Sequence, residues 1–227
     1  MLKGIKVVFL DVDNTLLDFN ACSRLSMQKA FEECGLPFEE TMYATFKQVN
    51  DSLWHKIEQG TITRAELLQQ RWPMILKQLG FDADGEMVET RYGKHMSQES
   101  VPIEGAYGLL EYLNSRYTVC VASNAPYELQ IKRLESVHML PFFHKIFVSE
   151  TVGTPKPGKA FFDACFRELP GIAPQETVLI GDSVTADIRG GRAYGMYTCW
   201  YDYAHSGSPC EEADFSVTSL EEIRHLL

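Results

Sequence analysis

Two aspartates near the start of the chain, Asp11 and Asp13, could do chemistry together because they follow a short apolar run at residues 7–10. The run has the length and composition of a buried strand. Strand side chains alternate with period two, so both carboxylates leave the strand end on one side, with Cα atoms roughly 6.5 Å apart. Carboxylates that close repel each other, and a hard cation such as Mg²⁺ would relieve the repulsion. A polar turn is the competing interpretation, since Asp and Asn favour turns.

Two later segments place further polar groups after apolar runs. The run at residues 117–122 is followed by Ser123 and Asn124, which could donate hydrogen bonds to a phosphoryl oxygen or form an ordinary turn. Lys156 stands between two prolines, after an apolar run at residues 145–148, and the prolines restrict its backbone. Most lysines are solvated surface charges, but an ammonium held here could neutralise both a carboxylate and a phosphate.

A further acidic segment follows the run at residues 177–180. Asp182 comes directly after this run and Gly181, where its carboxylate could be another ligand for a hard cation. Asp187 falls in the first turn of the next predicted helix, and the helix dipole alone would explain a carboxylate there. Each segment has an ordinary explanation, but their occurrence in one order after four successive strands favours a common site.

The elements that position these residues change character along the chain. Helical periodicity predicts four helices between the first run and residue 97, at about 21–34, 38–58, 63–79 and 84–97. Beyond them, apolar runs alternate with helical segments, which is typical of parallel strands joined by crossover helices. We therefore predict an α/β fold: a doubly wound, Rossmann-like parallel sheet core from residues 1–15 and 98–227, with an inserted all-α helical-bundle cap at 16–97. In such sheets ligands bind beyond the carboxyl ends of the strands.

Composition narrows the class of protein. The 227 residues are 45% hydrophobic with a formal charge of −10, which suits a packed core and disfavours nucleic-acid binding. The six cysteines lack zinc-ligand spacing, and reduced thiols are expected. Neither a membrane-spanning run nor a signal peptide is evident. We expect a cytoplasmic enzyme with no membrane partner; the sequence indicates no oligomeric state.

Together the four segments resemble the motifs of the haloacid dehalogenase-like superfamily. That superfamily has a nucleophile segment Asp-x-Asp-x-Thr, then a Ser or Thr, then a Lys, and finally a Gly-Asp segment with a second aspartate. The matching residues are Asp11, Asp13, Thr15, Ser123, Lys156, Asp182 and Asp187. The resemblance covers almost the whole chain, including a helical cap after the first motif.

The resemblance implies a mechanism. Asp11 would be the nucleophile that forms an aspartyl-phosphate, and Asp13 would protonate the leaving oxygen and then activate water. The metal that the resemblance implies is Mg²⁺, and residues of the same four motifs would bind the metal and the phosphoryl group. Asp11, the backbone carbonyl of Asp13 and Asp182 would hold the metal with support from Asp187, and Ser123 and Lys156 would hold phosphoryl oxygens. Since the dehalogenase branch lacks an acid at the position of Asp13, the presence of this aspartate favours a phosphatase or phosphomutase. The partner that the resemblance implies is a small phosphorylated metabolite.

Three segments, at residues 11–19, 123–134 and 181–191, are most similar to the pyrimidine 5'-nucleotidase branch, which acts on nucleoside 5'-monophosphates. One departure is Ala125, where that branch commonly has glycine. The predicted substrate-binding residues are Thr15, Phe19, Ser123, Asn124 and Lys156. Phe19 is the candidate to contact the base, whereas aromatic residues at helical spacing in the cap are expected in its core: Tyr43, Phe46, Trp54 and Trp72.

Two alternatives remain open at this point. The first is a sugar-phosphate or phosphoglycolate phosphatase, or a phosphomutase, of the same superfamily. The second is a phospho-accepting signalling domain, which also uses clustered aspartates, a Ser or Thr and a lysine. The aspartate spacing and the large insertion after the first strand disfavour this second alternative.

Overall fold

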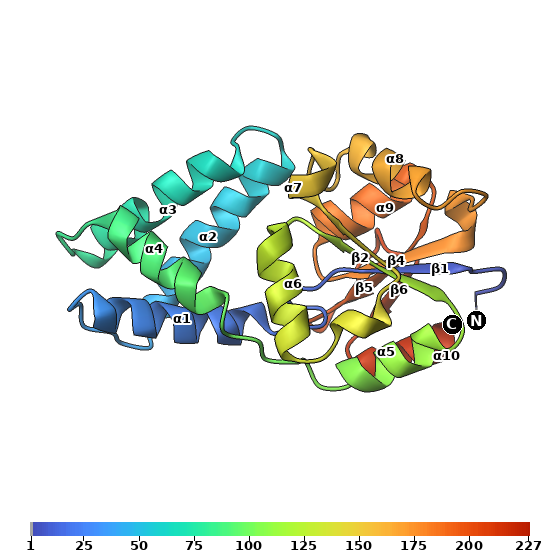
Figure 1. Cartoon of the computed structure of the whole chain (residues 1–227), viewed down its shortest axis with the longest axis horizontal. Coiled ribbons are helices and arrows are strands. Elements are labelled where there is room, and N and C mark those ends of the chain that lie inside the picture. Colours follow the sequence, from blue (N-terminus) through green and yellow to red (C-terminus); the bar gives the residue numbers. More distant parts are fainter. Residues whose placement is uncertain (1) are drawn as a thin grey trace. The chain divides into compact units, whose positions relative to one another are not determined.

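In the computed structural model, which describes residues 2–227, the chain divides into two units (Figure 1). The first comprises the chain up to Phe19 together with Val101–Leu227, and the second is Asn20–Ser100. The sequence places these borders a few residues earlier, after residue 15 and before residue 98. Each unit has its own elements and is described separately.

The first unit is built on a six-stranded sheet with the order β3-β2-β1-β4-β5-β6. Each neighbouring pair is parallel. The strands are β1 (Val7–Leu10), β2 (Thr118–Ser123), β3 (Lys145–Val148), β4 (Thr177–Gly181), β5 (Tyr197–Tyr201) and β6 (Phe215–Val217). The strand order reverses direction from β1, which confirms the predicted doubly wound parallel sheet.

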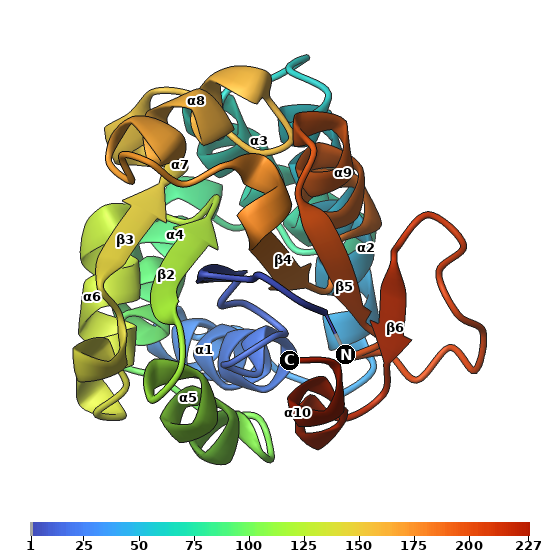
Figure 2. The same ribbon diagram turned by 90° about the vertical axis from the view of Figure 1, so that its right-hand side faces the viewer.

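Helices cover both faces of this sheet, as Figure 2 shows. One face carries α5 (Ala106–Asn114), α6 (Tyr127–Ser136) and α10 (Ile223–Leu226), and the other carries α8 (Lys159–Arg167) and α9 (Gly190–Tyr194). A short helix, α7 (Ser149–Val152), follows β3 directly. Two-sided burial explains why the strands are continuous apolar runs rather than alternating ones.

The central strand β1 shows this burial residue by residue. Val8 and Leu10 pack into the core beneath α5, whereas Val7 and Phe9 pack into the core beneath α8. All four side chains are at most 1% exposed. The strand is thus fixed in register on both faces, and this fixes the direction in which the residues after Leu10 leave the sheet.

The second unit is a bundle of four helices, and α1 begins one residue before it. These are α1 (Phe19–Glu33), α2 (Met42–Glu58), α3 (Arg64–Leu79) and α4 (Gly85–Met96). A capping box of Thr63 and Glu66 is present at the start of α3, and this helix continues past Pro73. Tyr43, Phe46 and Trp72 are buried, as predicted, whereas Trp54 is half-buried. Rings of α1 to α4 pack together in the centre of the bundle.

The two linkers between the units pair with each other within the first unit. The backbone N–H of Asp18 donates to Val101 O at 2.8 Å, and that of Ile103 donates to Leu16 O at 2.9 Å. Between these bonds Leu17 and Pro102 form an isolated antiparallel bridge. The exit and return of the chain are therefore held side by side.

The cysteines are spread through the structure. Cys120 is wholly buried, and burial raises the pKa of its thiol to about 12. All six cysteines are free thiols. Among residues 2–227, no helix has the length and apolar character that crossing a bilayer requires.

Candidate active site

The predicted site residues lie at one edge of the sheet because parallel strands end on the same side. Asp11 directly follows β1, Ser123 is the last residue of β2, and Asp182 directly follows β4. β2, β1 and β4 are neighbours in the sheet, so these three positions are adjacent. The N–H of Asp11 donates to Ile180 O at 2.9 Å, which extends the ladder to the site itself.

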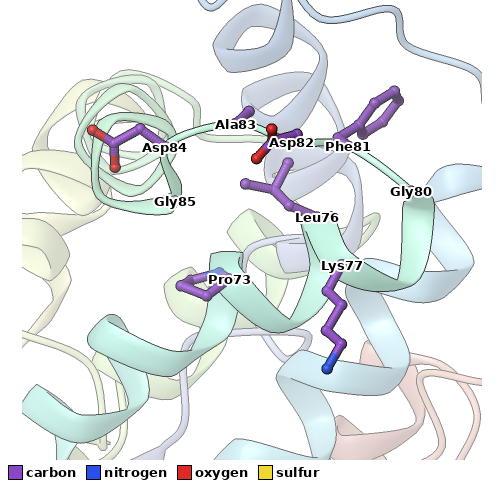
Figure 3. A pocket seen from close by; sticks show the side chains of 9 residues that line it. All are labelled: Pro73, Leu76, Lys77, Gly80, Phe81, Asp82, Ala83, Asp84 and Gly85. Carbon is purple, nitrogen blue, oxygen red and sulfur yellow. The ribbon is translucent and has the colours of Figure 1, made fainter.

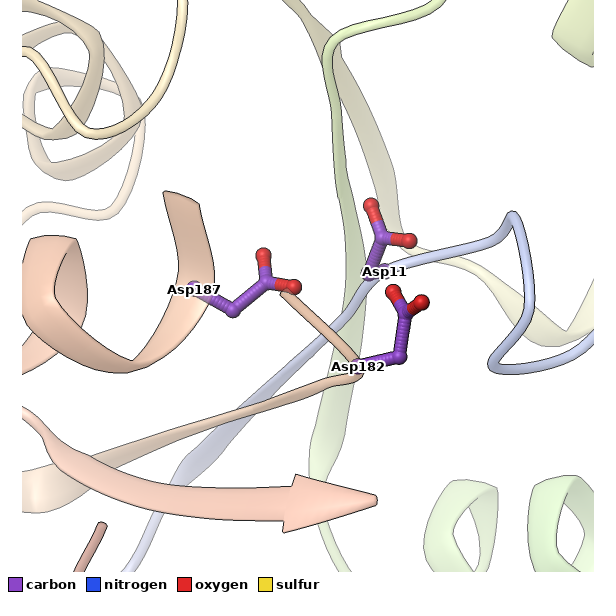
Figure 4. Close-up of side chains that lie close together, drawn as sticks. All are labelled: Asp11, Asp182 and Asp187. Atoms are coloured by element: carbon purple, nitrogen blue, oxygen red, sulfur yellow. The ribbon is translucent and has the colours of Figure 1, made fainter. Parts of the chain in front are cut away.

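Three carboxylates, of Asp11, Asp182 and Asp187, form a cluster at this edge (Figure 4). Each offers one oxygen, and these oxygens all lie within 4.8 Å of one another. Asp187 reaches the cluster from a π-helical turn, Val184–Arg189, and the N–H of Ser183 donates to its Oδ2 at 3.1 Å. The indole of Trp200 donates to the backbone carbonyl of Asp182 at 2.8 Å, which fixes the chain there.

Lys156 is the cation of the site. Its side chain is almost wholly buried, and Nζ donates to Asp11 Oδ1 at 2.9 Å and to Asp187 Oδ1 at 2.6 Å. A third bond, of 2.5 Å, goes to the backbone carbonyl of Ala122 in β2. All three hydrogens of the ammonium are thus used, so its position relative to Asp11 is fixed.

Burial and like charge shift the acidities in the cluster. Burial, with contributions from the charges of Asp187 and Asp13, raises the pKa of Asp11 to about 7 against the opposing effect of Lys156. Burial and then the charge of Asp11 hold the pKa of Asp182 well above its usual range. Burial lowers the pKa of Lys156, but the two carboxylates outweigh burial and leave it above its usual value.

This donor set fits a hard divalent cation. Three carboxylates share a single ammonium, and the raised pKa values of Asp11 and Asp182 show that their ionised forms lack sufficient positive charge. All the donors are oxygens, which suits Mg²⁺ better than a soft metal. Asp11, Asp182 and Asp187 are the side chains that would hold such an ion.

The side chain of Asp13 turns to helix α6 rather than to this cluster. Its Oδ1 accepts from Arg133 Nη1 at 2.5 Å, and its Oδ2 accepts from Gln130 Nε2 at 2.9 Å. We made no prediction for Gln130 or Arg133 from the sequence, although both lie in a segment that resembles the nucleotidase branch. The available signal was their spacing of three residues, which places both on one face of a helix.

Ser123 is arranged as a hydrogen-bond donor. Its Oγ accepts from the backbone N–H of Ala125 at 3.2 Å and from Gln130 Nε2 at 2.9 Å. A hydroxyl has two acceptor lone pairs and one hydrogen, so these bonds occupy the acceptor positions. The hydrogen of Ser123 is left to donate to a ligand, and its predicted contact with a phosphoryl oxygen stays a prediction.

Asn124 fastens the backbone of Lys156. Its Nδ2 donates to the carbonyl of Lys156 at 3.0 Å, and its Oδ1 accepts from the N–H of Lys156 at 2.8 Å. The carboxamide is thereby engaged at both ends. In this structure Asn124 therefore positions Lys156, and its predicted contact with a substrate stays a prediction.

The remaining two predicted residues lie on the loop after β1. Thr15 is wholly buried and its Oγ1 has no hydrogen-bond partner among the described residues, and its predicted contact with a substrate stays a prediction. Phe19 begins α1 and is half-buried. Neither Thr15 nor Phe19 takes part in the hydrogen bonds of Asp11 and Lys156 given above.

Gly181 provides a test of how closely the site is packed. A Cβ at Gly181 would lie 2.1 Å from Asp187 Oδ2, so Gly181→Ala must displace the carboxylate that pairs with Lys156. We expect the free energy of unfolding to fall by about 1–3 kcal/mol, as for overpacked cores. Thermal unfolding of the purified variant measures this.

Gly93→Ala is the matched control. A Cβ at Gly93 meets nothing within 4 Å, and Gly93 lies inside α4, where alanine is favoured by up to about 1 kcal/mol. Its melting temperature should equal or exceed that of the wild type. If Gly181→Ala were as stable as Gly93→Ala, Asp187 would not be fixed as described.

A surface hollow elsewhere does not compete as the site. It has a volume of about 590 Å³ and lies within the second unit, between the end of α3 and the start of α4 (Figure 3). Its lining includes two aspartates, of which Asp84 caps α4 by accepting from the N–H of Glu86. None of the residues predicted to do chemistry lines it.

Comparison with known sequences identifies relatives over most of the chain. The haloacid dehalogenase-like hydrolase family matches residues 5–195. The chain is 35% identical to the proposed HAD-hydrolase YfnB of Bacillus subtilis, over 100% of this chain and 97% of that protein. It is 31% identical to the pyrimidine 5'-nucleotidase PynA of Streptococcus pneumoniae, over 88% of this chain and 85% of that protein. It is 28% identical to the pyrimidine 5'-nucleotidase YjjG of Escherichia coli, with coverage of 97% and 96%.

The fold of the chain matches that of a solved structure. The crystal structure of YfnB bound to magnesium superposes with a TM-score of 0.92 at 35% identity and covers 98% of each chain. The similarity thus extends over both units of the chain.

Proposed function

The chain belongs to the haloacid dehalogenase-like hydrolase family and is a phosphomonoesterase, and on this premise we propose that it is a Mg²⁺-dependent 5'-nucleotidase working through an aspartyl-phosphate. The observation that carries the proposal is the position of Asp11. One of its carboxylate oxygens is 2.9 Å from the buried ammonium of Lys156, inside a cluster of three carboxylates that fits a divalent cation.

In the first step a carboxylate oxygen of Asp11 attacks phosphorus, and the bond from phosphorus to the ester oxygen breaks. Asp13 gives its proton to that leaving oxygen. The hydroxyl of Ser123 donates to a phosphoryl oxygen. Lys156, whose three hydrogens are engaged by protein oxygens, supplies a fixed positive charge beside the phosphoryl group and keeps Asp11 oriented through its two carboxylate contacts. Positioning and charge neutralisation are the main contributions a protein makes to phosphoryl transfer.

In the second step Asp13, now ionised, takes a proton from water, whose oxygen attacks the phosphorus of the aspartyl-phosphate. The bond from phosphorus to Asp11 breaks, which releases inorganic phosphate and restores the carboxylate. Bound Mg²⁺ supplies positive charge that offsets the phosphoryl group and the carboxylates around it. In both steps, Asp11 forms and releases the bond to phosphorus and Asp13 transfers the proton.

The relatives support a nucleotide as the substrate. Two proteins that match most of this chain, PynA and YjjG, are named as pyrimidine 5'-nucleotidases. Phe19 follows the nucleophile loop and is half-buried, and it stays our candidate to contact the base. The role of the helical unit as a cap likewise stays a prediction.

A phosphate-release screen with Mg²⁺ tests the substrate. We expect nucleoside 5'-monophosphates, pyrimidines first, to give the highest kcat/KM among nucleotides, sugar phosphates and phosphoglycolate. A sugar phosphate hydrolysed faster than every nucleotide would overturn the substrate and leave the chemistry intact. A stable phospho-protein without turnover would instead indicate a phospho-accepting signalling domain.

Metal binding should depend on pH with a definite sign. Asp11 and Asp182 have pKa values raised by burial, so in EDTA their ionisation costs stability as the pH rises from about 5 to 8. Mg²⁺ binds the ionised carboxylates and should therefore raise the melting temperature more at pH 8 than at pH 5. A Mg²⁺ concentration roughly 100-fold above its Kd should raise the free energy of unfolding by about 2.7 kcal/mol.

Asp182→Asn and Asp51→Asn form the matched pair for this measurement. Asp182 contributes to the cluster, whereas Asp51 is an exposed aspartate on α2. The rise in melting temperature caused by Mg²⁺ should be smaller in Asp182→Asn than in the wild type, and unchanged in Asp51→Asn. An equal shift at both pH values, or an unchanged shift in Asp182→Asn, would contradict a metal site at these carboxylates.

A further inference from the structure

We infer that Arg133, together with Gln130, is a positioning residue that holds the carboxylate of Asp13 in place for proton transfer. This inference rests on the proposed phosphatase function, in which Asp13 protonates the leaving oxygen. Neither residue belongs to the four motifs, and both come from helix α6.

The first observation is burial. Arg133 and Gln130 are both wholly buried on the same face of α6, beside the apolar Leu134. A buried guanidinium is costly unless an acid pairs with it. The acid that pairs with Arg133 is Asp13, the residue to which the proton transfer is assigned, and it is brought there from the loop after β1.

The second observation is that each oxygen of Asp13 has its own donor. Arg133 Nη1 is 2.5 Å from Oδ1, and Gln130 Nε2 is 2.9 Å from Oδ2. Rotation of the carboxylate would break at least one of these bonds. Gln130 is itself oriented, because its Oε1 accepts from Arg133 Nη1 at 3.3 Å, which leaves Nε2 to face Asp13.

The third observation is a link to the phosphoryl-binding group. The same Nε2 of Gln130 also donates to Ser123 Oγ at 2.9 Å. One amide nitrogen thus bridges the proton donor and the hydroxyl assigned to a phosphoryl oxygen, so α6 sets the distance between them. The side chain of Asp13 remains 26% exposed, and each of its oxygens keeps a second lone pair for a ligand.

These contacts predict which reactions depend on Arg133. A leaving alkoxide is a strong base and needs the proton of Asp13, whereas p-nitrophenolate is a weak base and leaves without it. If Arg133 acts by positioning Asp13, its removal should impair the hydrolysis of alkyl phosphates selectively. A residue that only stabilises the fold would affect both classes equally.

The experiment measures kcat/KM of Arg133→Met with p-nitrophenyl phosphate and with the alkyl phosphate that the wild type hydrolyses fastest, both with Mg²⁺. This parameter covers the steps up to transfer of the phosphoryl group to Asp11. A misplaced general acid should cost about 10²-fold with the alkyl phosphate, and less than about 5-fold with the aryl phosphate.

Three comparisons make the result specific. Asp13→Asn should show the same selectivity, and the double variant with Arg133→Met should lose little more than Asp13→Asn alone. Arg116→Met removes an exposed arginine of the same unit and should leave both substrates unaffected. Gln130→Met removes the other donor to Asp13 and carries the test if Arg133→Met does not fold.

Equal losses with the two substrates, or additive losses in the double variant, would overturn the inference while the phosphatase function stands. Wild-type protein that hydrolyses neither substrate with Mg²⁺ would overturn the proposed function, and the inference with it. Selective and non-additive loss supports Arg133 as the positioning residue.

Discussion

Asp11→Asn is expected to lower the rate of phosphate release at least about 10³-fold with any substrate that the wild type hydrolyses. The amide has nearly the shape of the carboxylate but cannot attack phosphorus. The fold should persist, because the amide oxygen can still accept from Lys156, whose Nζ is 2.9 Å from Oδ1 of Asp11. The loss therefore reports chemistry rather than unfolding.

Phosphate release and the mass of the intact protein measure this outcome. The wild type, quenched in acid during turnover, should carry a phosphoryl group that Asp11→Asn lacks. Asp51→Asn makes the same chemical change at an exposed position on α2 and should retain full activity. Turnover of Asp11→Asn close to the wild-type rate would exclude Asp11 as the nucleophile.

Lys156→Met is expected to lose both activity and stability. It removes the ammonium that pairs with Asp11 and Asp187, and thus leaves buried carboxylates without their cation. Breaking a buried ion pair from one side typically costs about 3–5 kcal/mol. Activity should fall at least about 10²-fold, since a fixed charge at the phosphoryl group is lost.

Thermal unfolding in EDTA measures the stability of this variant without compensation by a metal. The loss should be smaller at pH 5 than at pH 8, because the carboxylates whose pKa values are raised can take up protons at the lower pH. Lys159→Met is the matched control, since the side chain of Lys159 is 78% exposed. Equal stability of the two variants would show that Lys156 is not needed to balance the cluster.

The candidate site could be predicted from the sequence where its residues follow strands. Asp11, Ser123 and Asp182 come at the ends of apolar runs, and a parallel sheet brings such ends to one edge. Lys156 has the same origin, although α7 separates it from β3. The apolar runs, and the rule that parallel strands end at the same edge of a sheet, were sufficient to predict these positions.

The contacts made through helices could not be predicted in this way. Arg133 and Gln130 read as polar residues of a surface helix, and only the tertiary structure buries them against Asp13. The helix predicted to hold Asp187 in its first turn begins instead as a π-helical turn, in which Ser183 O accepts from the N–H groups of both Asp187 and Ile188. Sequence periodicity does not distinguish a π-helical turn from an α-helical one, although this turn carries Asp187.

The paired linkers bear on how such a chain can diversify. The isolated bridge of Leu17 and Pro102, with the hydrogen bonds on either side of it, holds the exit and return of the chain together within the first unit. The chain between Leu17 and Pro102 is thus a long insertion whose two ends are held next to each other. The entropic cost of closing such a loop rises only slowly with its length. Any module with neighbouring termini could be exchanged at this point while the catalytic edge is kept. The first unit can therefore keep its sheet and its cluster of carboxylates while the inserted segment changes in length and sequence.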